Sequence, residues 1–219
     1  MDLIQNRDEM AELYENKSVA EQNSMDIAWE LLMDESYKNL QQVLYTTKSE
    51  LRLLRQLAVN SIMATDIFDN DAKESREKRW NQAFGSLRTQ SQREMSVDDF
   101  ECLQATLILE HVLQASDAIH AMQHHTVFRK WNERLFEEMQ QAYKAKMSLK
   151  DPTDGAFEFE VMFFDDHILP LARKLQDCGA FGSSGHELLK YASENRALWA
   201  AQASDVVQEM TMRYNKGKT

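Results

Sequence analysis

Apolar side chains recur every three or four residues along most of the chain, the spacing that places them on one face of an α-helix. Such stripes predict helices over about residues 18–32, 47–62, 96–115, 126–146, 157–177 and 184–199. Alternating apolar and polar positions, which would indicate strands, are hard to find. The pattern therefore predicts an all-α fold of seven to nine helices.

Several residues mark where these helices begin or break. Ser18 and Glu21 have the spacing of a capping box. Either Thr47 or Ser49 is expected to cap the second helix, and Ser96 is a further candidate for a helix N-cap. Pro170 lies inside the stripe at 157–177 and implies a kink or a boundary, because proline removes a backbone donor.

The sequence also predicts the local environment of several other stretches. Residues 71–79 are strongly charged and are expected to be solvated, and residues 85–95 are expected to form a polar loop. In the helix at 126–146, the stripe formed by Val127, Trp131, Leu135 and Met139 is expected to face the core.

Composition supports long helices in one continuous domain. Only six glycines and two prolines occur in 219 residues, so helix breakers are rare. No linker marks a domain boundary, which predicts a single helical domain over residues 1–219, with a frayed tail at 215–219.

Charge and cysteine content exclude several classes of function. The 25 Lys and Arg against 36 Asp and Glu give a net charge of −11, which argues against a nucleic-acid partner or an anionic membrane surface. No apolar run is long enough to span a bilayer, and the N-terminus does not resemble a signal peptide. Two cysteines are too few for a disulfide scaffold, so a reducing, cytoplasmic location is expected.

The densest cluster of chemically capable residues is Asp117, His120 and His124. On one continuous helix, their spacing places a carboxylate and two imidazoles on a single face, which is a possible metal-ligand set. Because the preceding turns are apolar, Asp117 is expected near the end of a buried helix, where a carboxylate needs a partner. The ordinary alternative is that these residues pair with one another or lie in solvent.

Other candidates each have a structural alternative. Glu21 is either a buried acid or the second half of the capping box with Ser18. Asp66 is either a site acid or a residue at a helix end. Glu160 and Phe163 by themselves are more typical of surface charge and of core packing, respectively.

Five separated segments, taken together, resemble the catalytic domain of class I 3′,5′-cyclic-nucleotide phosphodiesterases. The order and spacing of the segments both fit that family, from about residue 6 to residue 200. The segments are residues 12–23, 62–67, 115–117 with 128–138, 160–171, and 194–199. The variant Met122-Gln123-His124 is more similar to protist and algal members than to animal ones.

The resemblance implies the family's helical fold, related to HD-type domains, and roles for three acids. Asp117 falls on the aspartate that helps to hold two catalytic metals, usually zinc and magnesium. Glu21 falls on an acid linked to the metal-bound water network, and Asp66 falls on an acid that lines the pocket. The activity implied is metal-dependent hydrolysis of cAMP, cGMP or both to 5′-monophosphates in signal transduction.

The resemblance also implies three base-binding positions. His120 replaces an asparagine that contacts the purine, and Glu160 replaces the purine-selecting glutamine. Phe163 falls on the aromatic residue that clamps the base. The two replacements leave the preference between cAMP and cGMP open.

The chain departs from the family in lacking its two histidine strings, which supply most metal ligands and the catalytic acid. It is therefore expected to be the C-terminal two-thirds of such a domain, truncated at its N-terminus and inactive alone. Stable retention of the two metals is not expected, because divalent ions need several ligands. The alternative is a non-catalytic helical binding module. A second copy, or a missing N-terminal segment, is a possible partner, and relatives are often tethered to membranes.

Overall fold

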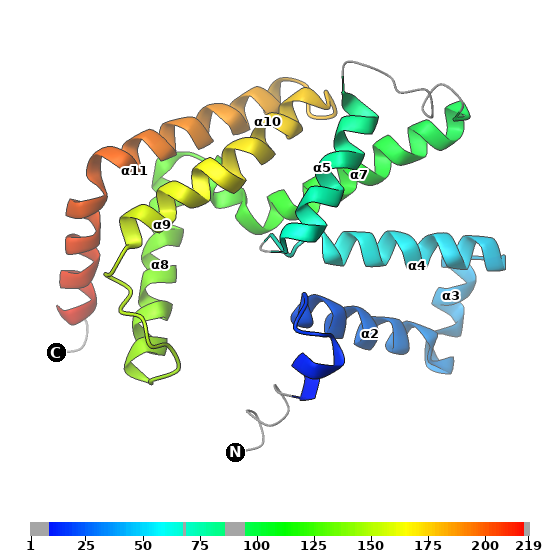
Figure 1. Cartoon of the computed structure of the whole chain (residues 1–219), viewed down its shortest axis with the longest axis horizontal. Coiled ribbons are helices and arrows are strands. Elements are labelled where there is room, and N and C mark those ends of the chain that lie inside the picture. Colours follow the sequence, from blue (N-terminus) through cyan, green and yellow to red (C-terminus); the bar gives the residue numbers. More distant parts are fainter. Residues whose placement is uncertain (1–8, 68, 86–94, 217–219) are drawn as a thin grey trace. The chain divides into compact units, whose positions relative to one another are not determined.

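The structure is a computed structural model that describes residues 9–67, 69–85 and 95–216, without the side chains at 156 and 157. Every regular element in these ranges is helical, which confirms the all-α prediction (Figure 1). The chain divides into two compact units, residues 1–117 and 118–219, and each is described by itself. The single domain expected from the sequence stays a prediction.

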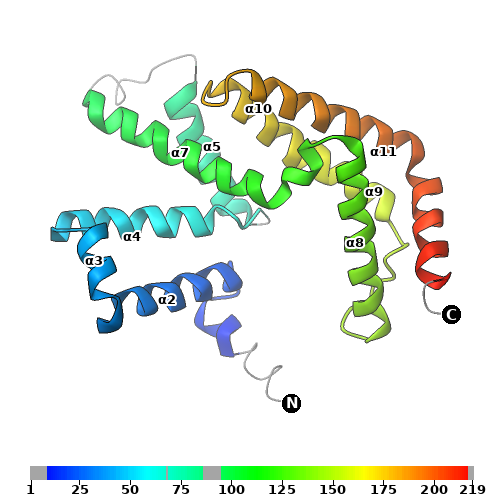
Figure 2. The same cartoon turned by 180° about the vertical axis from the view of Figure 1, so that it is seen from behind.

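The described part of the first unit is built from helices. Helix α3 connects α2 to α4, so that these two helices run antiparallel beside each other (Figure 2). The elements are α2 (Val19–Met33), the 3-10 turn η1 (Glu35–Tyr37), α3 (Lys38–Leu44), α4 (Lys48–Met63), α5 (Asn70–Phe84) and α7 (Val97–Ala118).

Two of the three predicted helix caps are present. The Thr47 hydroxyl accepts the Glu50 N–H at 3.2 Å, and the Glu50 carboxylate accepts the Thr47 N–H at 3.1 Å. The Ser96 hydroxyl accepts the Asp99 N–H at 3.1 Å. Ser18 precedes α2 but has a left-handed backbone, with φ at 39°, and its side chain makes no capping bond. The capping box predicted there is therefore wrong.

The charged stretch at 71–79 is part of helix α5, and most of its residues are exposed, as expected. One face of this helix is buried and includes Arg76 and Trp80. The guanidinium of Arg76 donates to the carbonyls of Met63 at 3.2 Å and Asp66 at 2.9 Å. These bonds satisfy the buried charge in a way that the local sequence pattern does not reveal. The polar loop expected at 85–95 lies largely outside the described residues, because 86–94 are not among them.

A buried ion pair links α5 to α7. Both guanidinium nitrogens of Arg79 donate to the Glu110 carboxylate, each at 2.8 Å. Next to this pair, the His111 and Trp80 rings lie 4.5 Å apart, and His111 Nδ1 is 2.7 Å from the Leu107 carbonyl oxygen. Glu110 is only 1 % exposed, and Arg79 donates two hydrogen bonds to its carboxylate.

The second unit begins with a short turn and ends with the longest helix. Its elements are η2 (Ile119–Met122), α8 (His125–Lys144), α9 (Ala156–Phe163), the π-helical turn η3 (Phe164–Ile168), α10 (Leu169–Asp177) and α11 (Ser183–Lys216). In the π-turn, the Leu169 N–H donates to the Phe164 carbonyl five residues earlier. Pro170 follows at the start of α10, which confirms the boundary predicted from it. Helix α11 includes residues 215 and 216, and residues 217–219 lie outside the described part.

Helices α10 and α11 form an antiparallel hairpin, visible from both sides (Figure 1). Gly179, in the turn between them, has φ at 72°, a conformation that glycine adopts without strain. At the start of α11, a β-carbon on Gly185 would lie 3.0 Å from the Gln176 Cα. Glycine therefore permits the close approach of the two helices.

The buried face of α8 is not the predicted one. The buried residues are Phe128, Asn132, Phe136 and Gln140, one position along from the expected stripe. Trp131, Leu135 and Met139 are partly exposed instead. Packing explains the shift, because the Phe128 ring contacts the rings of Phe164 and Trp199 edge-on, with centroids 5.3 and 6.0 Å away.

Asn195 ties α11 to the segment before α8. Its Nδ2 donates to the carbonyls of Ala121 at 2.9 Å and Gln123 at 2.7 Å, and the side chain is 1 % exposed. These bonds give both carbonyls a donor from a distant helix.

Replacing Asn195 with alanine is expected to lower the free energy of unfolding by about 2–3 kcal/mol, because two buried carbonyls lose their donor. Thermal unfolding followed by circular dichroism measures the change. The matched control is the exposed neighbour Glu194→Gln, expected to alter stability by less than about 0.5 kcal/mol. An equal effect of both changes would contradict the assignment.

None of the helices in the described ranges combines the length and apolar character needed to cross a membrane.

Candidate functional site

The candidate residues chosen from the sequence fall into two sets. Glu21, Asp66 and Asp117 belong to the unit of residues 1–117, and His120, Glu160 and Phe163 belong to the unit of residues 118–219. Each set is described within its own unit.

Glu21 lies half-buried in the first turn of α2. Ser18, its expected capping partner, instead donates its hydroxyl to Asp69 Oδ2 at 3.3 Å. The capping explanation of Glu21 is therefore removed, and its role as a site acid stays a prediction.

Asp66 lies in the turn between α4 and α5. Its Oδ1 accepts the Asp69 N–H at 3.1 Å, and Asp69 in turn caps α5 by accepting the Ala72 N–H at 3.1 Å. The side chain of Asp66 therefore stabilises a helix-connecting turn, as its structural alternative expected. A second role as a pocket acid stays a prediction.

Asp117 is exposed in the last turn of α7, so the expectation of a buried carboxylate is wrong. Helix α7 ends at Ala118, and His120 belongs to the 3-10 turn that follows, whereas His124 is the N-cap of α8. The three side chains therefore do not share one helix face. Within the part of the chain that the structure describes, no three His, Cys, Asp or Glu side chains are grouped to hold a metal.

Glu160 is a buried acid of the second unit with a raised pKa. It is only 8 % exposed, in α9, and burial raises its pKa from 4.5 to about 7. The nearby amide of Asn132 lowers this pKa to a smaller extent. The expectation that Glu160 alone is an ordinary surface charge is therefore wrong.

Glu160 and Asn132 line a cavity of about 210 Å³ within the second unit. The apolar part of its wall comes from α8, α9 and α11 and consists of Leu135, Phe136, Met139, Phe159, Trp199 and Met210. The segment before α9 supplies Lys150, Asp151, Pro152, Asp154 and Gly155. A mostly apolar hollow with a few convergent polar groups is typical of a small-molecule site.

His120 and Phe163 lie elsewhere in this unit, and the described residues that line the cavity include neither. His120 is half-buried, which lowers its pKa, and its ring centroid is 6.1 Å from that of Trp131. The Phe163 ring is 5.8 Å from the His167 ring. Of the three base-binding positions, the structure therefore places only Glu160 in the cavity.

A family model described as "3′5′-cyclic nucleotide phosphodiesterase" matches residues 3–179, well over half of the chain. The chain belongs to this phosphodiesterase family. A search of curated proteins finds no match.

Solved structures of similar fold include the phosphodiesterase domain of the RhoPDE fusion protein from the choanoflagellate Salpingoeca rosetta. It matches with a TM-score of 0.63 and 19 % identity, over 94 % of this chain and 63 % of that one. Another crystal structure of the phosphodiesterase domain of Salpingoeca rosetta rhodopsin phosphodiesterase matches with a TM-score of 0.63 and 18 % identity, over 96 % of this chain and 62 % of that one. This phosphodiesterase-family chain therefore shares their helical fold and spans about three-fifths of their length.

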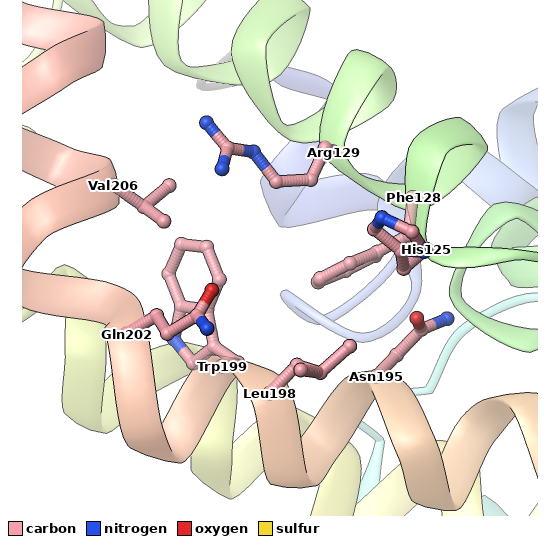
Figure 3. A pocket seen from close by; sticks show the side chains of 8 residues that line it. All are labelled: His125, Phe128, Arg129, Asn195, Leu198, Trp199, Gln202 and Val206. Atoms are coloured by element: carbon pink, nitrogen blue, oxygen red, sulfur yellow. The ribbon is translucent and has the colours of Figure 1, made fainter.

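A second hollow of about 250 Å³ lies between α8 and α11 of this phosphodiesterase-family chain (Figure 3). Its walls include Phe128 and Arg129 from α8 and Leu198 and Val206 from α11. Arg129 donates to Glu209 Oε2 at 2.9 Å, so its charge is already paired. Trp199 lines this hollow as well as the cavity that contains Glu160.

Asn132 and Trp199 line the cavity, although neither is a candidate residue from the sequence. The available signal was the i, i+4 series Phe128, Asn132 and Phe136, in which a polar residue interrupts an aromatic face. Trp199 lies at the end of the helix predicted over 184–199 and in the last family segment, and neither observation predicts a cavity there.

Proposed function

We propose that this chain is the base-binding part of a cyclic-nucleotide phosphodiesterase, and that the cavity around Glu160 holds the purine of a 3′,5′-cyclic nucleotide. One observation carries the proposal: a buried carboxyl and a buried amide converge on a largely apolar cavity of about 210 Å³. Such a lining suits a flat heterocycle with polar atoms along one edge. Membership of the family supplies the class of ligand.

The other candidate residues have proposed roles outside the cavity wall. By resemblance to the family, His120 would contact the purine and Phe163 would supply an aromatic face for the base, although neither lines this cavity. Glu21 and Asp66 would act on the water that attacks the phosphorus. Asp117 would bind one of two divalent metals, zinc or magnesium, which supply a nucleophilic hydroxide when bound.

The described residues do not by themselves fit a two-metal centre. Asp117 is exposed, and no group of three suitable ligands is found among the residues at 9–67, 69–85 and 95–216. One carboxylate supplies too few oxygen or nitrogen ligands for a divalent ion. No catalytic step through metals is therefore derived, and the role assigned to these 219 residues is binding and orientation of the nucleotide.

Titration calorimetry of the full chain with cAMP and cGMP tests the proposal. We expect at least one nucleotide to bind, and Glu160→Ala to weaken that binding about tenfold or more, because the base loses its buried polar partner. The matched control is Glu158→Ala, an exposed acid two residues earlier on the same helix. Equal losses in both variants, or no binding by the wild type, would contradict the proposal.

A turnover assay with Zn²⁺ and Mg²⁺ tests the metal expectation separately. We expect no hydrolysis, because the residues that the structure describes group too few ligands to hold a metal. Clear turnover that is lost in Asp117→Ala would overturn this expectation and would show that a metal centre forms.

A further inference from the structure

The polar edge of the cavity consists of two adjacent side chains, the carboxyl of Glu160 and the amide of Asn132. They are 8 and 9 % exposed, and much of the wall around them is aliphatic or aromatic. Asn132 Nδ2 is buried beside the Glu160 carboxyl, whose pKa the amide lowers, and no other described residue accepts a hydrogen bond from it. A buried donor without an acceptor costs free energy, so this edge is complementary to a ligand that supplies one.

The two side chains of this edge differ in the hydrogen bonds that they can donate and accept. An ionised carboxylate accepts at two oxygens and donates nothing. The amide of Asn132 has an acceptor at Oδ1 and two N–H donors at Nδ2, and Nδ2 is the atom buried beside the carboxylate. The edge therefore presents two acceptors beside one donor. Trp199 Nε1 is a second buried donor without a described partner, on a residue that lines the same cavity.

Purine bases differ in what they present to such an edge. Guanine carries two donors, N1–H and the N2 amino group, next to the O6 acceptor, and so matches two acceptors beside a donor. Adenine carries the N6 amino donor next to the N1 acceptor, which would face a carboxylate oxygen.

We propose that this cavity selects guanine, with Glu160 accepting from N1–H and N2–H and Asn132 donating to O6, so that cGMP is preferred over cAMP. This inference rests on the proposed function for the class of ligand. The choice of base comes from the donor and acceptor pattern of the two side chains. Asn132 thereby becomes a specificity-determining residue that the family comparison does not assign.

The protonation state of Glu160 adds a second consequence. Its pKa of about 7 means that the carboxyl is largely protonated at pH 6 and largely ionised at pH 8. A protonated carboxyl has one donor and one acceptor, which suits the adenine edge. The affinity ratio of cGMP to cAMP is therefore expected to rise about tenfold between pH 6 and pH 8.

Other charged groups face the same cavity and bear on this titration. Lys150, Asp151 and Asp154 come from the segment before α9. Asp151 Oδ1 accepts the Thr153 N–H at 2.9 Å, which lowers the pKa of Asp151 and keeps it ionised in this pH range. The described wall residues from α8 and α11 carry no charge.

The test is calorimetric titration of the full chain with cGMP, cAMP and cIMP at pH 6 and pH 8, together with 5′-GMP and 5′-AMP. At pH 8, cGMP is expected to bind about 10- to 100-fold more tightly than cAMP. The inosine analogue lacks the N2 amino group and is expected to bind about tenfold more weakly than cGMP.

Two variants assign the effect to the named atoms. Glu160→Gln is nearly isosteric and is expected to bring the cGMP to cAMP ratio close to one and to remove its pH dependence. Asn132→Leu is expected to weaken cGMP about tenfold while changing cAMP less. Glu158→Gln is the matched control, and circular dichroism verifies that each variant is folded.

The outcomes separate this inference from the proposed function. Equal or tighter binding of cAMP at pH 8 would overturn the choice of guanine and leave cyclic-nucleotide binding intact. Selective binding of 5′-GMP without cGMP would support the guanine edge and overturn the proposed function. Failure of every nucleotide to bind would overturn both.

Discussion

Replacing Arg79 with methionine is expected to lower the free energy of unfolding of the first unit by about 3–5 kcal/mol. The change removes both donors, each at 2.8 Å, from a carboxylate at Glu110 that is only 1 % exposed. A buried charge left without its partner is among the most destabilising single changes known in proteins. Urea unfolding followed by the fluorescence of Trp80, which packs next to the pair, measures the loss.

The adjacent residue provides a control for this result. Lys78 is exposed and pairs with Glu74 four residues earlier, at 2.8 Å, so Lys78→Met is expected to cost less than about 1 kcal/mol. The double variant Arg79→Met with Glu110→Leu is expected to recover most of the stability, because no unpaired charge remains. A double variant no more stable than Arg79→Met would show that the loss has another origin.

Replacing Glu160 with glutamine is expected to stabilise the second unit by about 3 kcal/mol at pH 8 and hardly at all at pH 4.5. The folded chain raises the pKa of Glu160 from 4.5 to about 7 and so favours the protonated form. The wild type therefore loses this stability as pH rises from about 4.5 to 7, by about 1.4 kcal/mol per pH unit, with a plateau above. Glutamine cannot ionise, and so it avoids the loss.

Chemical unfolding at pH 5, 6, 7 and 8 measures this difference. Glu158→Gln, which removes an exposed carboxylate from the same helix, is expected to show no comparable trend. A stability difference between wild type and Glu160→Gln that stays constant over this range would show that Glu160 is ionised throughout.

The sequence predicts those features of the fold that depend on residues close together in the chain. The caps at Thr47 and Ser96 and the boundary at Pro170 depend on residues close together in the chain, and all three are confirmed. Burial of charge is not a local signal, because it depends on partners far away in sequence. Arg79 and Glu110 are 31 residues apart, so the pattern at 71–79 resembled solvated charge.

The candidate site was predictable to a smaller extent. Resemblance to the family indicated Glu160, whose burial in a cavity no local pattern would have shown. The prediction of one helix face shared by Asp117, His120 and His124 was wrong because α7 ends at Ala118. No glycine or proline marks this helix end in the sequence. Asn132 was missed because packing of Phe128 and Phe136 decides which face of α8 is buried.

The π-helical turn at Phe164–Ile168 has a consequence for how relatives are aligned. A π-turn accommodates one more residue than an α-turn, so it offsets the helical register of α9 from that of α10 by about 100°. A homologue with an uninterrupted α-helix at this point would present the residue next to position 160 to the same hollow. If a homologue is aligned with a gap of one position in this turn, a different residue of the homologue is matched to Glu160. The alignment would then name the wrong side chain as the one that contacts the ligand.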